Sequence, residues 1–168
     1  MNQSEKEELL KQAEQVFFDA MLDGYAGERK HSTKVVSHDG NKKTITFTKG
    51  DFTVIDEYWV TPYSDHSAGT TTILHKDIAI WWMSYGGRYP KVLIPILKEA
   101  LREAYSRKEF IGGRGETPQS FGGYMYTNTW KGTFDSFYGK ETVEVDPTSE
   151  LTVVSAEGYH IYFGISLL

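Results

Sequence analysis

The sequence contains no cysteine among its 168 residues. This absence excludes a disulfide scaffold, a thiol nucleophile, and any metal or iron–sulfur site with thiolate ligands. A chain of this length buries roughly 70% of the surface of its unfolded form, so it does not need a disulfide or a metal to fold. We therefore expect one domain, residues 1–168, held together by a hydrophobic core.

The sequence also lacks a long apolar run and an excess of positive charge. Residues 1–20 lack the apolar core and cleavage site of a signal peptide. No apolar run reaches the roughly 20 residues that cross a bilayer. The net charge is −5, and basic residues are dispersed apart from Arg29-Lys30 and Lys42-Lys43, so nothing favours a phosphate backbone. We expect a cytoplasmic protein that binds no membrane and no nucleic acid.

Recognisable catalytic and metal-binding motifs are missing as well. The five histidines show no His-x-His or His-x-x-x-His spacing, and no Gly-x-Ser-x-Gly segment occurs. The glycines from Gly112 to Gly115 lack the Lys-Ser/Thr ending of a phosphate loop. We therefore expect no metal and no cofactor, and we assign no catalytic residue.

Two segments have the periodicity of amphipathic helices. In residues 4–23, Ser4 and Glu7 form the pattern of a capping box, apolar residues recur at helical spacing, and Gly24 is a natural stop. The second helix is expected from Pro95, used as a first-turn residue, to about Arg107.

Most of the remaining sequence predicts β-strands. The strand over residues 50–60 places Phe52, Val54, Asp56 and Tyr58 on one face. Residues 78–85 are almost continuously apolar, which is typical of a central strand covered on both faces. The other expected strands cover residues 34–37, 43–48, 70–75, 124–130, 133–138, 141–145, 151–155 and 159–166. Residues 62–68 and the segment through Ser120 are expected to be loops.

Four features recur in the same order in both halves of the chain. They are a helix, an aromatic-x-Gly segment, an aromatic strand carrying Asp or Asn, and a Gly-x-x-Thr-aliphatic segment. The matched residues are Tyr25-Ala26-Gly27 with Phe110-Ile111-Gly112, Phe52/Asp56/Tyr58 with Tyr124/Asn128/Trp130, and Gly69/Thr72/Ile73 with Gly139/Thr142/Val143. We predict an α+β fold of two tandem helix-plus-antiparallel-meander repeats, about 4–86 and 90–168, related by a pseudo-twofold axis.

The seam between two such repeats is a common place for a ligand pocket. Asp56 and Asn128 are the candidate polar anchors of this pocket, and an aromatic wall would raise the pKa of a carboxyl group by desolvation. The alternative is that both residues cap turns or bond to tyrosine hydroxyls. The other candidate ligand-binding residues in and around the wall are Tyr58, Trp82, Tyr124, Tyr126, Trp130 and Glu141.

Arg88 and Arg114 each follow a Gly-Gly pair. Glycine-rich backbone forms anion-binding concavities, and arginine offers a two-donor fork to a carboxylate or phosphate. The alternative is that each arginine pairs with Asp or Glu. Both are included among the candidate ligand-binding residues.

The chain resembles a bacterial family of domains of unknown function, whose members occur alone or behind XRE-type helix-turn-helix repressors. The residues that carry the resemblance are 25–27, 50–52, 56, 58, 80–86, 97–102, 113–115, 126, 128, 132, 137, 139 and 141. The family usually has a proline where Glu116 stands and a second glycine near Gly164. The chain shows no helix-turn-helix segment, so it resembles the stand-alone form. The resemblance supplies no activity; attachment to repressors implies sensing of a small molecule.

These observations favour a binding module for a small anionic or aromatic ligand, used in sensing or sequestration, over an enzyme. Two alternatives stay open. One is a protein-interaction or inhibitor module without a small ligand, and the other is a hydrolase that uses Asp56 or Glu141. The oligomeric state is open too, a homodimer included.

Overall fold

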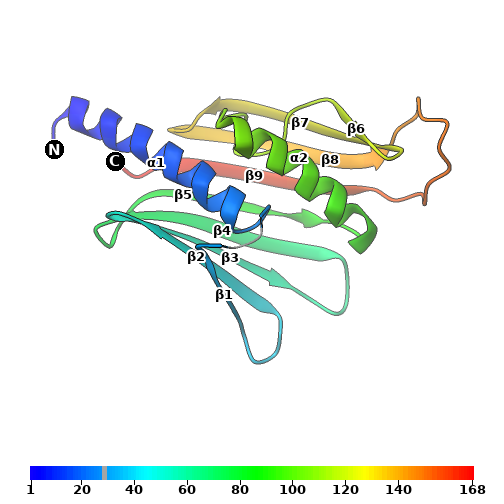
Figure 1. Cartoon of the computed structure of the whole chain (residues 1–168), viewed down its shortest axis with the longest axis horizontal. Coiled ribbons are helices and arrows are strands. Elements are labelled where there is room, and N and C mark those ends of the chain that lie inside the picture. The colour runs from blue at the N-terminus through cyan, green and yellow to red at the C-terminus, as the bar shows by residue number, and fades with distance from the viewer. Residues whose placement is uncertain (28–29) are drawn as a thin grey trace.

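The computed structural model describes residues 1–27 and 30–168, so the expectations for Glu28 and Arg29 lie outside it. It confirms an α+β fold: within the described chain, one antiparallel sheet of nine strands carries two α-helices on one face (Figure 1). The elements are α1 (Gln3–Asp23), β1 (Thr33–Val36), β2 (Lys42–Lys49), β3 (Phe52–Val60), β4 (His66–His75), β5 (Ile78–Arg88), α2 (Ile94–Arg107), β6 (Gln119–Phe121), β7 (Tyr124–Thr133), β8 (Ser136–Val145) and β9 (Gly158–Ser166).

Helix α1 begins earlier than the sequence pattern indicated. The capping box is formed by Asn2 and Glu5, not by Ser4 and Glu7. The Asn2 side chain accepts a hydrogen bond from the Glu5 backbone N–H at 3.0 Å, and the Glu5 carboxylate accepts one from the Asn2 backbone N–H at 2.7 Å. Asparagine caps a helix as well as serine does, so the earlier polar residue extends the helix.

Helix α2 starts with Pro95 in its first turn, as predicted, and follows a short 3₁₀ segment, Lys91–Leu93. Its buried side chains are Leu97, Ala100, Leu101, Ala104 and Tyr105. The helix ends at Lys108, whose φ of 55° lies in the left-handed region. Both helices pack their apolar faces on the sheet and on one another (Figure 1).

The strand order is β1-β2-β3-β4-β5-β9-β8-β7-β6. Strands β5 and β9 pair at the centre, with Tyr85 directly opposite Tyr162. On one side of this central pair the sheet continues outward through β4, β3, β2 and β1, and on the other side through β8, β7 and β6. Segments about 75 residues apart in sequence therefore meet at the middle of the sheet.

Several strand predictions were wrong in detail. One continuous strand, β8, replaces the two expected at 133–138 and 141–145, because Gly139 stays in register between Trp130 and Tyr162. Residues 151–155 form no strand, whereas β6 and the first residues of β4 occupy segments expected to be loops.

Among the described residues, the two helices cover only one face of the sheet. The expectation that β5 is covered on both faces was wrong: Trp82 lies on the uncovered face, half-buried, with its ring 5.3 Å from that of Phe163. Trp82 is apolar although it lies on the uncovered face, so the β5 sequence lacks the apolar–polar alternation of a strand covered on one face. The exposed apolar residues of the uncovered face include Trp59, Tyr138, Ile161, Phe163 and Ile165.

Two central tyrosines lie across glycines of the neighbouring strands. Tyr85 on β5 passes over Gly69 on β4, and its hydroxyl donates to Asp56 on β3 at 2.8 Å. Tyr162 on β9 passes over Gly139 on β8, and its hydroxyl donates to Asn128 on β7. Each ring needs a neighbour without a side chain, so these glycines allow a polar contact that spans three strands.

We expect Gly69→Ala to destabilise the protein by about 1–3 kcal/mol, the usual cost of overpacking. The new Cβ would lie 2.6 Å from both the Glu57 backbone oxygen and Cζ of Tyr85. Gly86→Ala is the control, because its Cβ would make an ordinary 3.4 Å contact with Ala68. Urea denaturation gives the free energy of unfolding of both variants. Equal stability of the two would contradict the proposed role of Gly69.

Candidate functional site

Arg114 is buried in the loop that follows α2. The loop reaches the sheet through Gly112 and Gly113, whose φ angles of 74° and 67° favour glycine. A Cβ on Gly112 would lie 2.6 Å from the hydroxyl of Tyr162. The glycines that suggested an anion-binding loop therefore serve first to bring Arg114 against the centre of the sheet.

Three polar side chains fix this loop. Asn128 donates from Nδ2 to the carbonyl oxygens of Ile111 at 2.8 Å and Gly115 at 3.1 Å. The Tyr126 hydroxyl accepts from the backbone N–H of Gly115 at 2.8 Å. The Tyr105 hydroxyl on α2 donates to the carbonyl oxygen of Gly113 at 3.1 Å. These bonds on both sides of Arg114 determine where its side chain points.

The guanidinium of Arg114 lies over two tyrosine rings, 4.8 Å from the centre of Tyr85 and 5.4 Å from that of Tyr162. Its Nη1 is 3.6 Å from Oε1 of Glu141. Its Nε and Nη2 are buried and have no hydrogen-bond partner within the described parts of the chain. Buried donors normally find partners, so this unpaired edge requires an explanation.

Glu141 is the buried anion beside Arg114. It accepts hydrogen bonds from the Tyr126 hydroxyl at 2.7 Å and from Nδ1 of His160 at 3.1 Å. Burial favours its neutral form, but the charge of Arg114 and these donors outweigh burial and hold the pKa of Glu141 below its usual range. Glu141 is therefore ionised and balances the charge of Arg114.

His160 lies between Glu141 and Ser67. Burial lowers the pKa of His160, although its bond to Glu141 acts in the opposite direction. The neutral ring donates from Nδ1 to Glu141, which leaves Nε2 to accept from the Ser67 hydroxyl at 3.3 Å.

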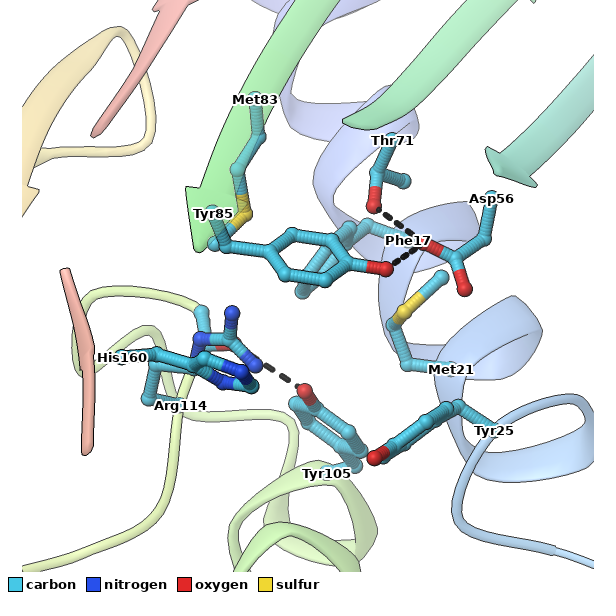
Figure 2. A pocket seen from close by; sticks show the side chains of 11 residues that line it. Phe17, Met21, Tyr25, Asp56, Thr71, Met83, Tyr85, Tyr105, Arg114 and His160 are labelled. Atoms are coloured by element: carbon cyan, nitrogen blue, oxygen red, sulfur yellow. Dashed lines mark hydrogen bonds between the residues drawn. The ribbon is translucent and has the colours of Figure 1, made fainter. Parts of the chain in front are cut away.

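Asp56 is a second buried carboxyl group, only 3% exposed. Thr71 and Tyr85 both donate to its Oδ1, at 3.0 Å and 2.8 Å. Burial raises the pKa of Asp56, and these two bonds and the charge of Arg114 only partly oppose the effect. Figure 2 shows Thr71 and Tyr85 meeting at one oxygen of Asp56, with the other oxygen turned away from them.

A cavity of about 20 Å³ lies between Asp56 and Arg114. This is room for about one water molecule. Asp56 and Arg114 approach the space from two sides, and Tyr25 and Tyr105 border it below (Figure 2). The lining residues are Phe17, Met21, Tyr25, Asp56, Thr71, Met83, Tyr85, Tyr105, Gly113, Arg114 and His160. Apolar and aromatic walls thus surround the Asp56 carboxyl group and a guanidinium whose Nε and Nη2 have no partner among the described residues.

The structure brings together only some of the predicted site residues. Asp56 and Arg114 line the cavity, and Glu141 pairs with Arg114. Tyr126 and Asn128 hold the Arg114 loop instead. Asn128 on β7 lies five strand spacings away from β3 and does not line the cavity beside Asp56.

The other predicted residues lie farther from the cavity. Tyr58 packs its ring against Tyr25 at 6.2 Å, and Trp130 lies beside Gly112. The Tyr124 hydroxyl donates to Val154. Trp82 is on the uncovered face, and Arg88 is exposed at the end of β5.

Sequence reasoning missed Tyr85, Thr71 and His160, which complete the polar network. Gly69 and Gly139 carried a usable signal, since a glycine inside a strand often marks a close approach by another group. Nothing in the spacing of His160 pointed to Glu141, because their contact depends on strand register.

Comparison with known families supports the resemblance seen in the sequence. The model of a domain of unknown function, DUF5680, matches residues 63–159, which is more than half of the chain. The chain belongs to the DUF5680 family. The DUF5680 match includes Arg114, Asn128 and Glu141, while Asp56 lies before it and His160 directly after it. No curated protein and no solved structure matches the chain.

Two further findings concern the described residues only. No group of three or more His, Asp or Glu side chains is placed to hold a metal ion. Neither helix is long and apolar enough to cross a membrane.

The raised pKa of Asp56 predicts a pH-dependent stability. The folded protein holds the Asp56 proton more tightly than the unfolded chain, so stability is lost as pH rises above 3.8 and through the folded pKa. We expect Asp56→Asn, which cannot ionise, to gain stability relative to wild type over this window, by up to about 1.4 kcal/mol per pH unit. His160 is present in both proteins, so its contribution to the pH dependence cancels from the difference in stability.

The measurement is urea denaturation of wild type and Asp56→Asn at several pH values between 4 and 8. The matched control is Asp51→Asn, at an exposed aspartate that pairs with Lys76 on the surface. A constant difference between wild type and Asp56→Asn across this range would show that Asp56 is not perturbed.

Proposed function

We propose that this DUF5680 protein is a small-molecule-binding module for sensing or sequestration, with its site in the cavity between Asp56 and Arg114. The unpaired Nε and Nη2 of Arg114 carry this proposal. A buried donor without a partner costs about 1–3 kcal/mol, and more when it belongs to a charged group. A bound molecule that supplies acceptors would remove this cost.

The buried charge itself is already balanced by Glu141. Glu141 lies beside Nη1 and does not pair with Nε or Nη2 on the other edge of the guanidinium. What the site lacks is therefore a pair of acceptors at one edge of Arg114. The acceptors must lie beside Nε and Nη2, on the edge that Glu141 does not occupy. This favours a bound molecule over a purely structural ion pair.

Duplication of a helix-plus-meander unit is part of the proposal, with the cavity at the seam of the two repeats. The strand order supports it, because each side of the β5–β9 pair runs outward through consecutive strands, β4 to β1 on one side and β8 to β6 on the other, with β1 as the additional strand. The arrangement of Gly69, Tyr85 and Asp56 corresponds to that of Gly139, Tyr162 and Asn128. Arg114 contacts both tyrosines and so lies at the proposed pseudo-twofold axis.

Sensing would follow if relatives carry this domain behind XRE-type repressors, as the resemblance implies. The hydrolase alternative gains no support from the geometry. Asp56 and Glu141 lie on β3 and β8, four strand spacings apart, or about 19 Å between backbones at the usual strand separation. Paired carboxyl groups of glycosidases lie closer, at about 5–10 Å.

The test is a thermal-shift screen of wild type, Arg114→Lys and Arg88→Lys against a broad set of small metabolites. Lysine keeps the charge of Arg114 but cannot provide the two parallel donors. We expect some compounds to stabilise wild type by about 2.7 kcal/mol at 100 times the dissociation constant, and not to stabilise Arg114→Lys. Arg88→Lys is the control, since Arg88 is exposed and lines no part of the cavity. Compounds that stabilise all three proteins equally would contradict the proposed site.

A second candidate function is self-association through the uncovered sheet face. Tyr138, Ile161, Phe163 and Ile165 are each at least 42% exposed and lie on the adjacent strands β8 and β9. Contiguous exposed apolar residues often mark interaction sites. A face at the middle of the sheet can pack on its own copy about a twofold axis.

Sedimentation velocity over a range of protein concentrations tests this candidate. We expect wild type to form dimers and Phe163→Ser to shift the equilibrium to monomers. Tyr63→Ser removes an aromatic side chain that is 93% exposed but lies outside this face, so it should leave the dimer intact. A wild-type protein that is monomeric at every concentration rules the candidate out.

A further inference from the structure

We infer that Ser67, His160 and Glu141 form a hydrolytic triad for small esters, with Ser67 as the nucleophile and His160 as the general base. The triad adjoins the cavity between Asp56 and Arg114 through His160, but it needs no ligand in that cavity. It also differs from a hydrolase with two carboxyl groups, because Glu141 positions a histidine and does not touch the substrate.

Strand register brings the three side chains into one row across the sheet. Ser67 on β4 lies opposite Gly87 on β5, which in turn lies opposite His160 on β9. Glu141 is the partner of His160 on β8. Two strand spacings, or about 10 Å, separate the backbones of Ser67 and His160. Their side chains can meet because Gly87 places no side chain between them.

The hydrogen bonds along this row run in the order that a triad requires. The Ser67 hydroxyl donates to Nε2 of His160 at 3.3 Å, and Nδ1 of the same ring donates to Oε1 of Glu141 at 3.1 Å. The first bond links a nucleophile to its base, and the second fixes the orientation and the tautomer of that base. Nη1 of Arg114 lies 3.6 Å from the same Oε1, beyond hydrogen-bond distance. Glu141 therefore remains available to hold His160.

The protonation states suit this assignment. Burial lowers the pKa of His160, so its Nε2 carries no proton and can take the one from Ser67. Burial alone would raise the pKa of Glu141, but the charge of Arg114 and the donors around the carboxyl group hold that pKa below its usual range. The resulting carboxylate stabilises the imidazolium that forms when the proton is transferred.

Ser67 is the member of the row that solvent reaches. It is partly exposed, whereas His160 and Glu141 are 4% and 0% exposed. The residues opposite Ser67 on the two neighbouring strands, Val60 and Gly87, are partly exposed as well. A substrate therefore meets Ser67 from outside the protein, with its acyl group beside Val60. These shallow surroundings favour a short acyl group.

The reaction is acyl transfer from an ester to water. The Ser67 Oγ attacks the carbonyl carbon while Nε2 of His160 takes the hydroxyl proton. The bond between that carbon and the alcohol oxygen then breaks, the alcohol leaves with the proton, and the acyl group stays on Ser67. Water attacks this acyl group with His160 again as the base, which releases the carboxylic acid and restores the Ser67 hydroxyl. Water is the only co-reactant.

The first measurement is covalent labelling of the whole chain with phenylmethanesulfonyl fluoride, in which a serine oxygen bonds to sulfur and displaces fluoride. Peptide mass spectrometry then locates the adduct, which we expect on Ser67. The matched control is Ser64→Ala. The Ser64 hydroxyl also lies 3.2 Å from a histidine nitrogen, Nδ1 of His66, but both residues are exposed and no carboxylate of the described chain bonds to that ring. Labelling of Ser67 should therefore be the same in wild type and Ser64→Ala.

The second measurement is the release of para-nitrophenol from para-nitrophenyl acetate. We expect an initial burst from the acyl-Ser67 intermediate. We also expect kcat/KM to be about tenfold lower or less in Ser67→Ala than in wild type and Ser64→Ala. His160→Gln removes the base and should abolish labelling of Ser67. If His160→Gln fails to fold, Ser67→Ala still decides, because it removes only a partly exposed hydroxyl.

An adduct on Ser64 but not on Ser67, or no adduct on any serine, would overturn the inference. Equal rates of ester hydrolysis for wild type and Ser67→Ala would overturn it as well. None of these results bears on the proposed binding site, whose test depends on metabolites and on Arg114→Lys. The two proposals can therefore fail separately.

Discussion

The burial of one guanidinium is the constraint on which the centre of this structure depends. A charged group away from water must be paired and hydrogen-bonded, or its burial is too costly. Arg114 obtains an anion from Glu141 and aromatic faces from Tyr85 and Tyr162. Glu141 in turn requires the donors of Tyr126 and His160. Most of the polar network around Arg114 therefore follows from this one residue, and its own Nε and Nη2 have no partner among the described residues.

Sheet geometry makes this network possible. Neighbouring strands lie about 4.8 Å apart, so a tyrosine can reach across one strand only if that strand presents no side chain. Gly69 and Gly139 supply that gap on the two sides of the β5–β9 pair. Each tyrosine then holds a polar residue with its hydroxyl while its ring forms part of the surface under Arg114. The same two side chains thus make a structural contact and form part of the surface that Arg114 packs on.

The sequence predicted what depends on local pattern and missed what depends on register. Apolar spacing identified both helices, and alternation identified most strands. Gly139 was misread as a strand break, because a glycine under an aromatic ring and a glycine in a turn look alike without the neighbouring strand. The shared pattern identified Asp56 and Asn128 as candidates. It did not reveal the four strands between them, because residue spacing does not determine strand order. Arg114 was found through its glycines, whereas its ion pair with Glu141, and the bond from His160 to Glu141, depend on the register of β8 and β9.

Asp56 and Asn128, which the proposed duplication places at corresponding positions, have different surroundings. Asn128 donates to two carbonyl oxygens of the Arg114 loop, so that loop fills the space above it. Asp56 has no amide N–H to donate to two carbonyl oxygens, and it instead accepts from Thr71 and Tyr85. The space beside Asp56 therefore remains open toward Arg114. If the halves arose by duplication, as proposed, the change between Asn128 and Asp56 distinguishes them. The half with Asn128 holds the Arg114 loop, and the half with Asp56 borders the cavity beside Arg114.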